Sequence, residues 1–366
     1  MTEGGRIRIA FVSCAPYTGG AERYVELLAA GLDRERYEAV LITSGSPGLE
    51  PLRSSLAAEG IRCESTKGKS FSGAGGAGSF VRLVKRLHPD IVHINMPGPF
   101  DCHYGLTASL ARLAGTRRIV TTDHLPMIRS FAKARLLRSI HVPHVSRFIT
   151  VSENNRSHMV DEHGVPDAKI RIVYNGVPDP GTAGVSAMGR SATVELLVAG
   201  ALEERKGHLA LLAAMEQLPG KFRLSIAGDG PLHGKIEEEI SSRGLDGRIS
   251  LLGRVEDMPR LIARCDILVV PSFLEATPYV ILEAMAAGRP VVASAIFGIP
   301  EQVEDGVTGI LTLPGDSAAL AGALLRISGD PALIQEMGEA GRKRYEARFT
   351  LERSVAETVS VYDELF

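Results

Sequence analysis

The stretch PSFLEATPYVILEAMAAGRPVVAS, residues 271–294, places a loop and a helical segment between two apolar runs. These runs are ILVVPSF (267–273) and PVVASAI (290–296), and both are rich in Val and Ile. Such runs on either side of a helix are typical of buried parallel strands joined by a crossover. The stretch therefore predicts one strand–helix–strand unit of a parallel sheet.

The start of the predicted helix carries the first candidate site. Thr277 suits the N-cap and Pro278 the first helical position. We expect the N–H groups of Tyr279 and Val280 to form an anion site there, at the carboxyl end of the preceding strand. Glu275 lies in the loop before this helix.

The same alternation of apolar runs and helical segments extends through both halves of the chain. A segment rich in Pro, Gly, Ser and Ala, residues 177–193, interrupts it and reads as a linker. We therefore expect an α/β protein with two doubly wound parallel-sheet domains and a ligand crevice at the strand ends, between the domains. The further predicted strands are RIRIAFVSC, YEAVLITSG, DIVHINM, RRIVTTDH, RFITVSE and IRIVYNGV before the linker, and VELLVAGAL, FRLSIAGDG and ISLLGR after it.

Composition limits the class of protein. The chain has 366 residues, of which 45% are hydrophobic, and no apolar run approaches the roughly 18 residues of a membrane-spanning helix. The amino terminus enters a strand pattern without a signal-peptide core, which favours a cytoplasmic protein. The four cysteines lack any metal-ligand spacing, so we expect free thiols at Cys14, Cys63, Cys102 and Cys265.

Charge is divided unequally along the chain. Residues 1–184 carry 23 Lys/Arg against 17 Asp/Glu, a net charge of +6, and the remainder has a net charge of −8. The stretch 129–147 contains Arg and Lys but no acidic residue. A solvated helix face explains it; the alternative is contact with an anionic acceptor or a membrane surface. Without a recognised module, the charges do not indicate nucleic-acid binding.

A glycine-rich loop, FSGAGGAGSF at 71–80, has the spacing G-x-G-x-x-G. A dinucleotide site needs a buried strand before these glycines, and the preceding CESTKGKSFS is too polar for one. The segment SFVRLVKRLHPD that follows reads as a helix. The loop is therefore interpreted as a flexible entry to that helix, and phosphate chemistry is expected elsewhere.

Glu-x7-Glu followed by AMAAGRPVV resembles the signature of GT-B glycosyltransferases of family four, which are retaining enzymes that use nucleotide-activated sugars. Other segments lie in the order and at the spacing of that family, so the resemblance runs across nearly the whole chain. They are GGAERYV, DIVHIN, TTDHLP, VSENNR, YNGV, AGDGP and LLGRVEDMP. The resemblance implies an acceptor-binding domain at 1–184, a donor-binding domain at 185–345, and a helix at 346–366 that crosses back onto the first domain.

The resemblance also assigns roles at the donor site. Glu283 would bind the ribose hydroxyls and Glu275 the transferred sugar. The amides of Gly19 and Gly20 would share the diphosphate with those from Thr277 to Val280. The remaining donor-site residues on this reading are Gly200 and Arg254.

Two adjacent cations, Arg205 and Lys206, precede Gly207 at the start of another helix. They would stabilise the charge on a departing diphosphate; a surface cluster with Glu203 and Glu204 is the alternative. The sequence departs from the family where Ala201 stands in place of a common Arg, and Ala276 similarly stands where the family often has Gly.

Two histidines and an asparagine are candidates on the acceptor side. His124 follows a strand and could bond the sugar or polarise the reacting centre, or it is a structural histidine. His93 and Asn95 are assigned to the acceptor site by the resemblance. We expect no metal, because no Asp-x-Asp occurs and Pro143 interrupts the His-x-x-His at residues 141 to 144. No cofactor is expected beyond the donor substrate.

The resemblance implies a retaining glycosyltransferase that moves a sugar from a nucleoside diphosphate sugar, with UDP favoured, to a hydroxyl of a small molecule, glycan or lipid-linked acceptor. Two alternatives stay open. One is a nucleotide-sugar epimerase of the same fold, and the other is a catalytically silent scaffold. The intact pair of glutamates and Lys206 argue against the scaffold.

Overall fold

The computed structural model describes residues 5–68, 71, 75–97, 106–125, 139–181 and 193–366. The chain divides into two compact units. The amino-terminal unit comprises Met1–Asn175 together with Leu351–Phe366, and the carboxyl-terminal unit comprises Gly176–Thr350. Most of the expected linker, the glycine Gly73, Cys102 and the basic residues 129–138 lie outside the described residues.

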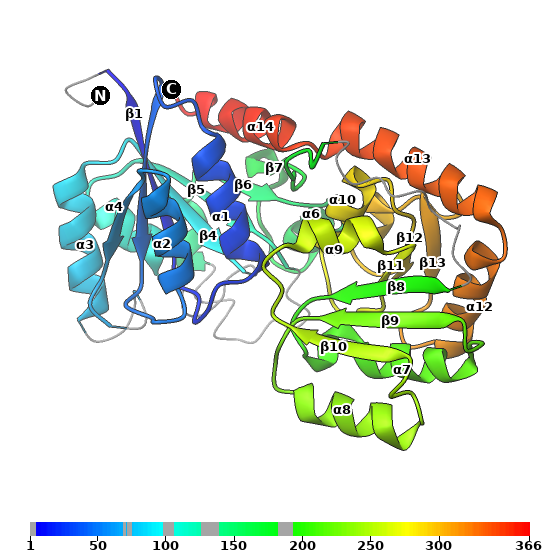
Figure 1. The fold of residues 1–366 in the computed structure, drawn as a ribbon. Coiled ribbons are helices and arrows are strands. Elements are labelled where there is room, and N and C mark those ends of the chain that lie inside the picture. Colours follow the sequence, from blue (N-terminus) through cyan, green and yellow to red (C-terminus); the bar gives the residue numbers. More distant parts are fainter. Residues whose placement is uncertain (1–4, 69–70, 72–74, 98–105, 126–138, 182–192) are drawn as a thin grey trace. The chain divides into compact units, whose positions relative to one another are not determined.

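The described part of the amino-terminal unit forms a parallel sheet of seven strands in the order β3-β2-β1-β4-β5-β6-β7. Helices cover both faces (Figure 1). The strands are β1 (Ile7–Ser13), β2 (Tyr37–Thr43), β3 (Arg62–Ser65), β4 (Ile91–Met96), β5 (Arg118–Asp123), β6 (Arg147–Thr150) and β7 (Ile170–Ile172). The helices are α1 (Gly20–Gly31), α2 (Glu50–Ala58), α3 (Gly76–Leu87), α4 (Thr107–Leu113), α6 (Glu153–Asp161) and α14 (Leu351–Asp363), with short 3-10 turns η1 (Val142–His144) and η2 (Asp167–Lys169).

The described part of the carboxyl-terminal unit forms a parallel sheet of six strands in the order β10-β9-β8-β11-β12-β13. Its strands are β8 (Val194–Ala199), β9 (Phe222–Ala227), β10 (Ile249–Gly253), β11 (Ile267–Val270), β12 (Val291–Ser294) and β13 (Gly309–Thr312). Its helices are α7 (His208–Gln217), α8 (His233–Ser242), α9 (Met258–Arg264), α10 (Tyr279–Ala286), α11 (Ile299–Gln302), α12 (Ser317–Ser328) and α13 (Pro331–Arg348), with the 3-10 turn η3 (Glu204–Lys206).

Each sheet has one principal core built from the predicted apolar runs. In the amino-terminal unit, Val12 and Val92 pack with Phe80 and Leu83 of α3. In the carboxyl-terminal unit, the cluster joins β8, β9 and β11 to α7, α8 and α12. All six residues of the central strand β4 are buried, as expected of a strand covered on both faces. The predicted α/β class with two doubly wound parallel sheets is confirmed.

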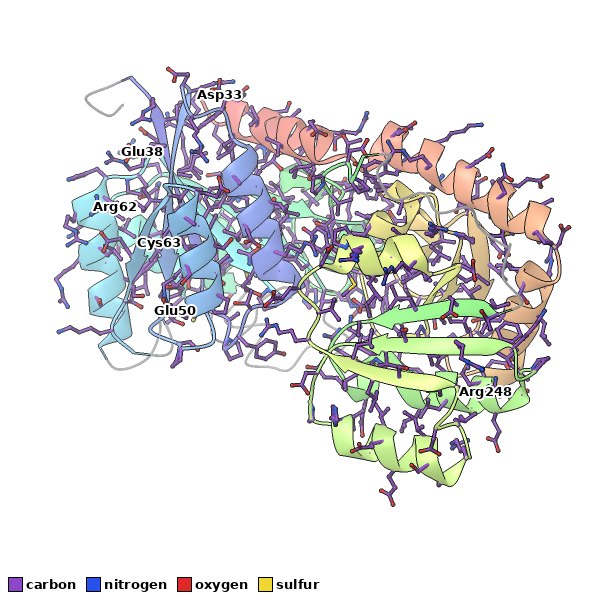
Figure 2. The ribbon with its side chains drawn as sticks, viewed as in Figure 1. Asp33, Glu38, Glu50, Arg62, Cys63 and Arg248 are labelled. Carbon is purple, nitrogen blue, oxygen red and sulfur yellow. The ribbon has the colours of Figure 1, made fainter. Side chains whose placement is uncertain are left out.

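For the described residues of CESTKGKSFS, the prediction that no buried strand precedes the glycines is confirmed, although a strand does occur there. The first residues of this segment belong to β3, a parallel edge strand paired with β2 from Arg62 to Ser65. The strand is half-exposed, and Figure 2 shows Arg62 and Cys63 on it. Glu64 forms ion pairs with Arg62 and Arg86. A short strand with one open edge tolerates charged side chains, so the polar composition argued only against a buried strand.

Candidate functional site

The chain reverses direction across the sheet at β8 in the carboxyl-terminal unit. From β8 it adds β9 and β10 on one side, and then returns to add β11 on the other. At such a switch point the loops after the two central strands diverge, leaving a crevice at their carboxyl ends. A small pocket lies there, lined in part by Val198 and Ala199 of β8 and by Val269 and Val270 of β11.

Two glycines allow the loops around this pocket to meet. Gly207 has φ +70°, and a Cβ there would lie 1.9 Å from the carbonyl oxygen of Pro271. A Cβ on Gly228 would lie 1.9 Å from the carbonyl oxygen of Gly200. Both positions therefore require glycine for backbone-to-backbone contact as well as for conformation.

The turn η3 is tied to the loop after β11. The carbonyl oxygen of Arg205 accepts hydrogen bonds from the N–H groups of Phe273, at 2.7 Å, and Leu274, at 3.4 Å. These bonds bring the segment containing Lys206 against the segment containing Glu275. Lys206 also extends along Gly200, where a Cβ would lie 3.3 Å from Lys206 Cε. The backbone thus aims the lysine across the end of β8.

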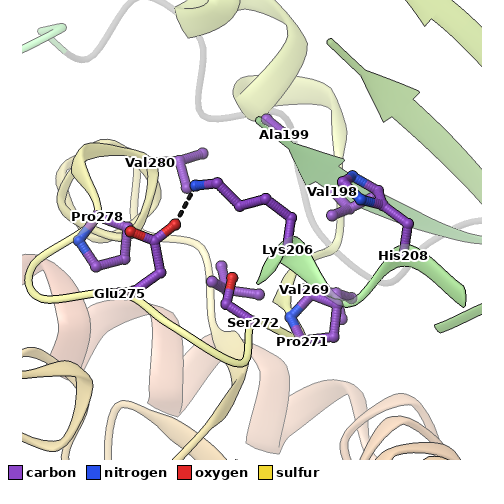
Figure 3. A pocket seen from close by; sticks show the side chains of 11 residues that line it. Val198, Ala199, Lys206, His208, Val269, Pro271, Ser272, Glu275, Pro278 and Val280 are labelled. Carbon is purple, nitrogen blue, oxygen red and sulfur yellow. Dashed lines mark hydrogen bonds and ion pairs between the residues drawn. The ribbon is translucent and has the colours of Figure 1, made fainter. Parts of the chain in front are cut away.

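The ammonium of Lys206 donates to Oε1 of Glu275, and Figure 3 shows its side chain crossing the pocket to reach the carboxylate. The side chain of Glu275 is 8% exposed and that of Lys206 is 17% exposed. Arg205 lies farther away, with Nη1 3.6 Å from the same oxygen. Its Nε donates instead to Glu203 at 2.8 Å. The pair Lys206 and Glu275 is therefore the charged centre of the site, with Arg205 at its edge.

The start of α10 forms another wall of the pocket, through Pro278 and Val280. Here the sequence prediction is wrong by one residue. Pro278 is the N-cap, the helix begins at Tyr279, and no side-chain cap bond is made. Thr277 and Pro278 are buried. The helix N-terminus and Glu275 still line the same pocket, and a helix N-terminus suits an anion.

Gln302 forms a hydrogen bond with the start of this helix. Its Nε2 donates to the carbonyl oxygen of Pro278 at 3.3 Å, and the side chain is fully buried. Glu283 lies one turn into α10 and is partly buried. Because Glu275 precedes the helix, the two carboxylates are held by different backbone segments, as predicted.

Arg254 is the outlying member of the predicted donor set. It is exposed and follows β10, the edge strand separated from β8 by β9. Strands are spaced by roughly 4.8 Å, so its Cα lies about 10 Å across the sheet from the end of β8.

Gly19 and Gly20 belong to the amino-terminal unit, at its own switch point after β1. Gly19 is the N-cap of α1. Its N–H donates to Oε2 of Glu22 at 3.1 Å, and Oε1 of Glu22 accepts from Ser13 at 2.9 Å. Sequence analysis did not single out Glu22, although an acidic residue three positions after an N-cap is a known capping signal. Burial raises the pKa of Glu22.

The candidate acceptor residues are also in the amino-terminal unit. His124 and Asn95 are together, with Nε2 of the histidine 2.7 Å from Oδ1 of the asparagine. His93 is bonded at both ring nitrogens, to Tyr362 of α14 at 2.5 Å and to Thr122 at 2.7 Å. These bonds leave His93 a structural partner of α14, whereas Asn95 keeps an unpaired, buried Nδ2 among the described residues.

Burial keeps these histidines neutral. The pKa of His93 is lowered to about 3 by desolvation and then by His124, and that of His124 is lowered to about 3 by desolvation. Next to His124, desolvation raises the pKa of Asp123 to about 7. A neutral imidazole can donate or accept a hydrogen bond but carries no charge for an anion.

Within the described residues, no group of three or more His, Cys, Asp or Glu is arranged to hold a metal ion. Over the same ranges, no helix is long and apolar enough to cross a membrane. Of the basic stretch 129–147, the described Arg147 pairs with Glu364 at 2.8 Å. Among the described residues, Cys14, Cys63 and Cys265 form no disulfide.

Two parallel-sheet units with a site at the switch point of the second define the GT-B fold of glycosyltransferases. The solved structure of Anabaena HepE in complex with UDP matches with a TM-score of 0.80, covering 98% of this chain and 100% of that one at 23% identity. This likeness establishes the fold.

Sequence comparison assigns each unit to a family. Residues 18–179 match the model described as Glycosyltransferase Family 4, and residues 193–330 match Glycosyl transferases group 1. Most of each unit therefore matches a family model of glycosyltransferases.

Curated relatives share parts of this sequence. An exopolysaccharide phosphotransferase of Streptomyces coelicolor is 28% identical over 288 residues, which cover 78% of this chain and 29% of the relative. A glycogen synthase of Mycobacterium tuberculosis is 31% identical over 220 residues, which cover 58% of this chain and 53% of the relative. The chain thus spans about half or less of the length of these relatives.

Proposed function

We propose that this protein is a retaining, metal-independent glycosyltransferase that moves a sugar from a UDP-sugar to a hydroxyl of a small molecule, glycan or lipid-linked acceptor. The observation that carries the proposal is the contact between Lys206 and Glu275 beside the first turn of α10. A cation and helix amides there suit the anionic phosphates of a sugar diphosphate, and a carboxylate suits the hydroxyls of its sugar.

Donor binding would exchange partners within this site. The ammonium of Lys206 would turn to the diphosphate and leave Glu275 free to accept hydrogen bonds from the sugar. The amides at Tyr279 and Val280 would hold the phosphates, and Glu283 would accept from the ribose. As the bond to the sugar breaks, negative charge grows on the diphosphate, and a fixed cation then stabilises the transition state more than the bound donor.

The acceptor hydroxyl would attack from the same face, and its proton would pass to the leaving phosphate oxygen. His124 and Asn95 are candidates for orienting the acceptor or the sugar by hydrogen bonds. His124 is neutral, so its contribution would be a hydrogen bond rather than a charge. Lys206, with Arg205 nearby, would replace the metal ion that other glycosyltransferases use to bind a diphosphate. UDP is favoured because the structural neighbour HepE is solved with it.

A thermal-shift panel of UDP, GDP, ADP and dTDP tests the donor class. A ligand at 100 times its dissociation constant adds roughly 2.7 kcal/mol of stability, so the correct nucleotide should stand apart. Transfer from the matching sugar nucleotide should continue in excess EDTA. NMR of the product should show that the anomeric configuration is retained. Loss of transfer that magnesium restores would reject metal independence, and an inverted product would reject retention.

The same donor incubated without acceptor separates the alternatives. An epimerase would convert it to a new sugar nucleotide, and a silent scaffold would leave it unchanged even with acceptors present. Slow hydrolysis of the donor is expected from a transferase that lacks its acceptor.

A further inference from the structure

His208, the first residue of α7, lines the pocket on the side of Lys206 away from Glu275 (Figure 3). It is 2% exposed, and neither ring nitrogen has a hydrogen-bond partner among the described residues. Burial, and then the charge of Lys206, lowers its pKa to about 4. A neutral ring has one N–H donor and one acceptor nitrogen, so His208 brings two unused hydrogen-bonding groups to the pocket.

A buried polar group without a partner costs about 1 to 3 kcal/mol, and native proteins satisfy such groups with ordered water. The pocket has a volume of about 10 Å³, close to the smallest space that holds one water molecule. Its other polar lining groups are Lys206, Glu275 and the hydroxyl of Ser272. A bound water makes two to four hydrogen bonds, and the pocket supplies that number of partners.

We propose that this pocket binds one water molecule that joins His208 to Lys206, and that His208 is thereby a positioning residue for the lysine. The water would donate to the acceptor nitrogen of His208 and accept one N–H of the ammonium. An ammonium has three N–H groups. One donates to Glu275, one to the water, and the third is available to a ligand.

The water and His208 would hold the ammonium of Lys206 in place when a diphosphate replaces Glu275 as its partner. The stem lies along Gly200, so the head is the part that can move. Once a diphosphate draws the ammonium from Glu275, the water and His208 keep the head over the end of β8. A neutral imidazole suits this role, because a charged ring would repel the lysine. This catalytic consequence rests on the proposed function; the water site does not.

The activity test compares His208→Leu with His208→Asn. Leucine removes both hydrogen-bonding groups and should lower kcat between about 10- and 100-fold, the range of a misplaced catalytic group, with little change in donor KM. Asparagine can still hold the water and should retain most of the turnover. Leu212→Ala, in the same helix but outside the pocket, controls for lost stability and should keep wild-type kcat. Wild-type turnover in His208→Leu, or equal losses in Leu and Asn, would overturn the positioning role.

Two measurements on the donor-free protein test the water site without activity. A high-resolution crystal structure should show one water bonded to a ring nitrogen of His208. Nitrogen NMR of labelled histidine should show a neutral ring between about pH 5 and pH 8, whereas an unperturbed histidine titrates near 6.5. An empty pocket or a ring that titrates near 6.5 would overturn the site. If the wild-type protein transfers no sugar, the proposed function is rejected, but the crystallographic and NMR results still decide whether the water site exists.

Discussion

Lys206 contacts Glu275 across 69 positions of sequence, and both side chains are largely withdrawn from solvent. Each is therefore the other's counter-ion in the donor-free protein. A ligand that replaces Glu275 as the partner of Lys206 must supply the carboxylate of Glu275 with other hydrogen-bond donors. The hydroxyls of a sugar are such donors. Donor binding should thus need both ends of the ligand, the phosphates and the sugar.

Lys206→Met should lower kcat by about 100-fold, the effect of removing one preorganised electrostatic group. It should also cost about 3 kcal/mol of unfolding free energy, because the buried Glu275 loses its nearer cation and keeps only Arg205, at 3.6 Å. Adding Glu275→Gln to Lys206→Met should recover most of that stability and none of the turnover. Steady-state kinetics and urea unfolding measure the two effects; recovery of turnover in the double variant would contradict the assigned role.

Arg205→Ala should lower kcat by less than Lys206→Met does, because Arg205 pairs with Glu203 and only approaches Glu275 at 3.6 Å. Installing Ala201→Arg in that background tests whether the cation common in the family can substitute. Initial rates with saturating donor give the comparison. If Arg205→Ala keeps wild-type turnover, Arg205 is a surface residue and Lys206 acts without it.

The two glutamates should affect different kinetic constants. Glu283→Ala would remove the proposed contact with the ribose, which is the same before and during bond breaking, so it should raise donor KM about tenfold and spare kcat. Glu275→Gln changes the group beside the transferred sugar and should lower kcat as well. Equal effects of both variants on both constants would show that the roles are not divided.

Gly207→Ala should cost about 1 to 3 kcal/mol and also reduce turnover, because the new methyl group would meet Pro271 and displace the turn before it. Gly234→Ala is a matched control in α8, where a Cβ meets nothing within 4 Å. There alanine should stabilise the helix by about 0.5 to 1 kcal/mol. Thermal unfolding and kcat should be measured for both; an unchanged Gly207→Ala would refute the close approach.

Stability should fall as the pH drops below about 6.5. The pKa values of His93 and His124 are lowered to about 3, and those of His141 and His208 to about 4. Each is neutral in the folded state and protonates on unfolding, so each removes about 1.4 kcal/mol per pH unit between its unfolded and folded pKa.

Two carboxyl groups act in the opposite direction. Asp123, with its pKa raised to about 7, and Glu22, with its pKa also raised, bind protons in the folded state that the unfolded chain has released. They therefore favour folding as the pH falls, but the four histidines outnumber them. Urea unfolding between about pH 7 and pH 4.5 should show a net loss of stability. A flat profile would contradict the lowered histidine pKa values, because it means that the folded and unfolded states take up equal numbers of protons.

The apolar runs were sufficient to predict the parallel sheets, since Val and Ile runs of strand length have few other uses in a chain of this composition. The two described strands that were missed are β3 and β13. β3 is half-exposed at the sheet edge, and β13 has four residues beginning at Gly309, whose Cβ would lie 2.0 Å from the carbonyl oxygen of Val291. There close packing, not hydrophobic patterning, dictates the residue.

Sequence analysis predicted Lys206 and Glu275 as site residues, but it did not predict their contact. That contact depends on the hydrogen bonds from the loop after β11 to the carbonyl of Arg205, which are long-range and made by the backbone. His208 was missed for a similar reason. Its proposed role depends on its burial and on ring nitrogens that lack hydrogen-bond partners among the described residues. Neither property can be predicted from the residue type or its spacing.

The amino-terminal unit is discontinuous in sequence, and this affects the order in which the protein forms during synthesis. The segment Met1–Asn175 is synthesised before α14. Some of its contacts need the later segment: His93 bonds to Tyr362, and both Arg147 and Arg171 pair with Glu364. The intervening unit, Gly176–Thr350, has its own sheet and core and emerges complete before them. Domains generally fold as units while the chain grows. The unit made first is thus the last to be completed, and a nascent chain that stalls before α14 has one complete unit and one in which His93 still lacks Tyr362.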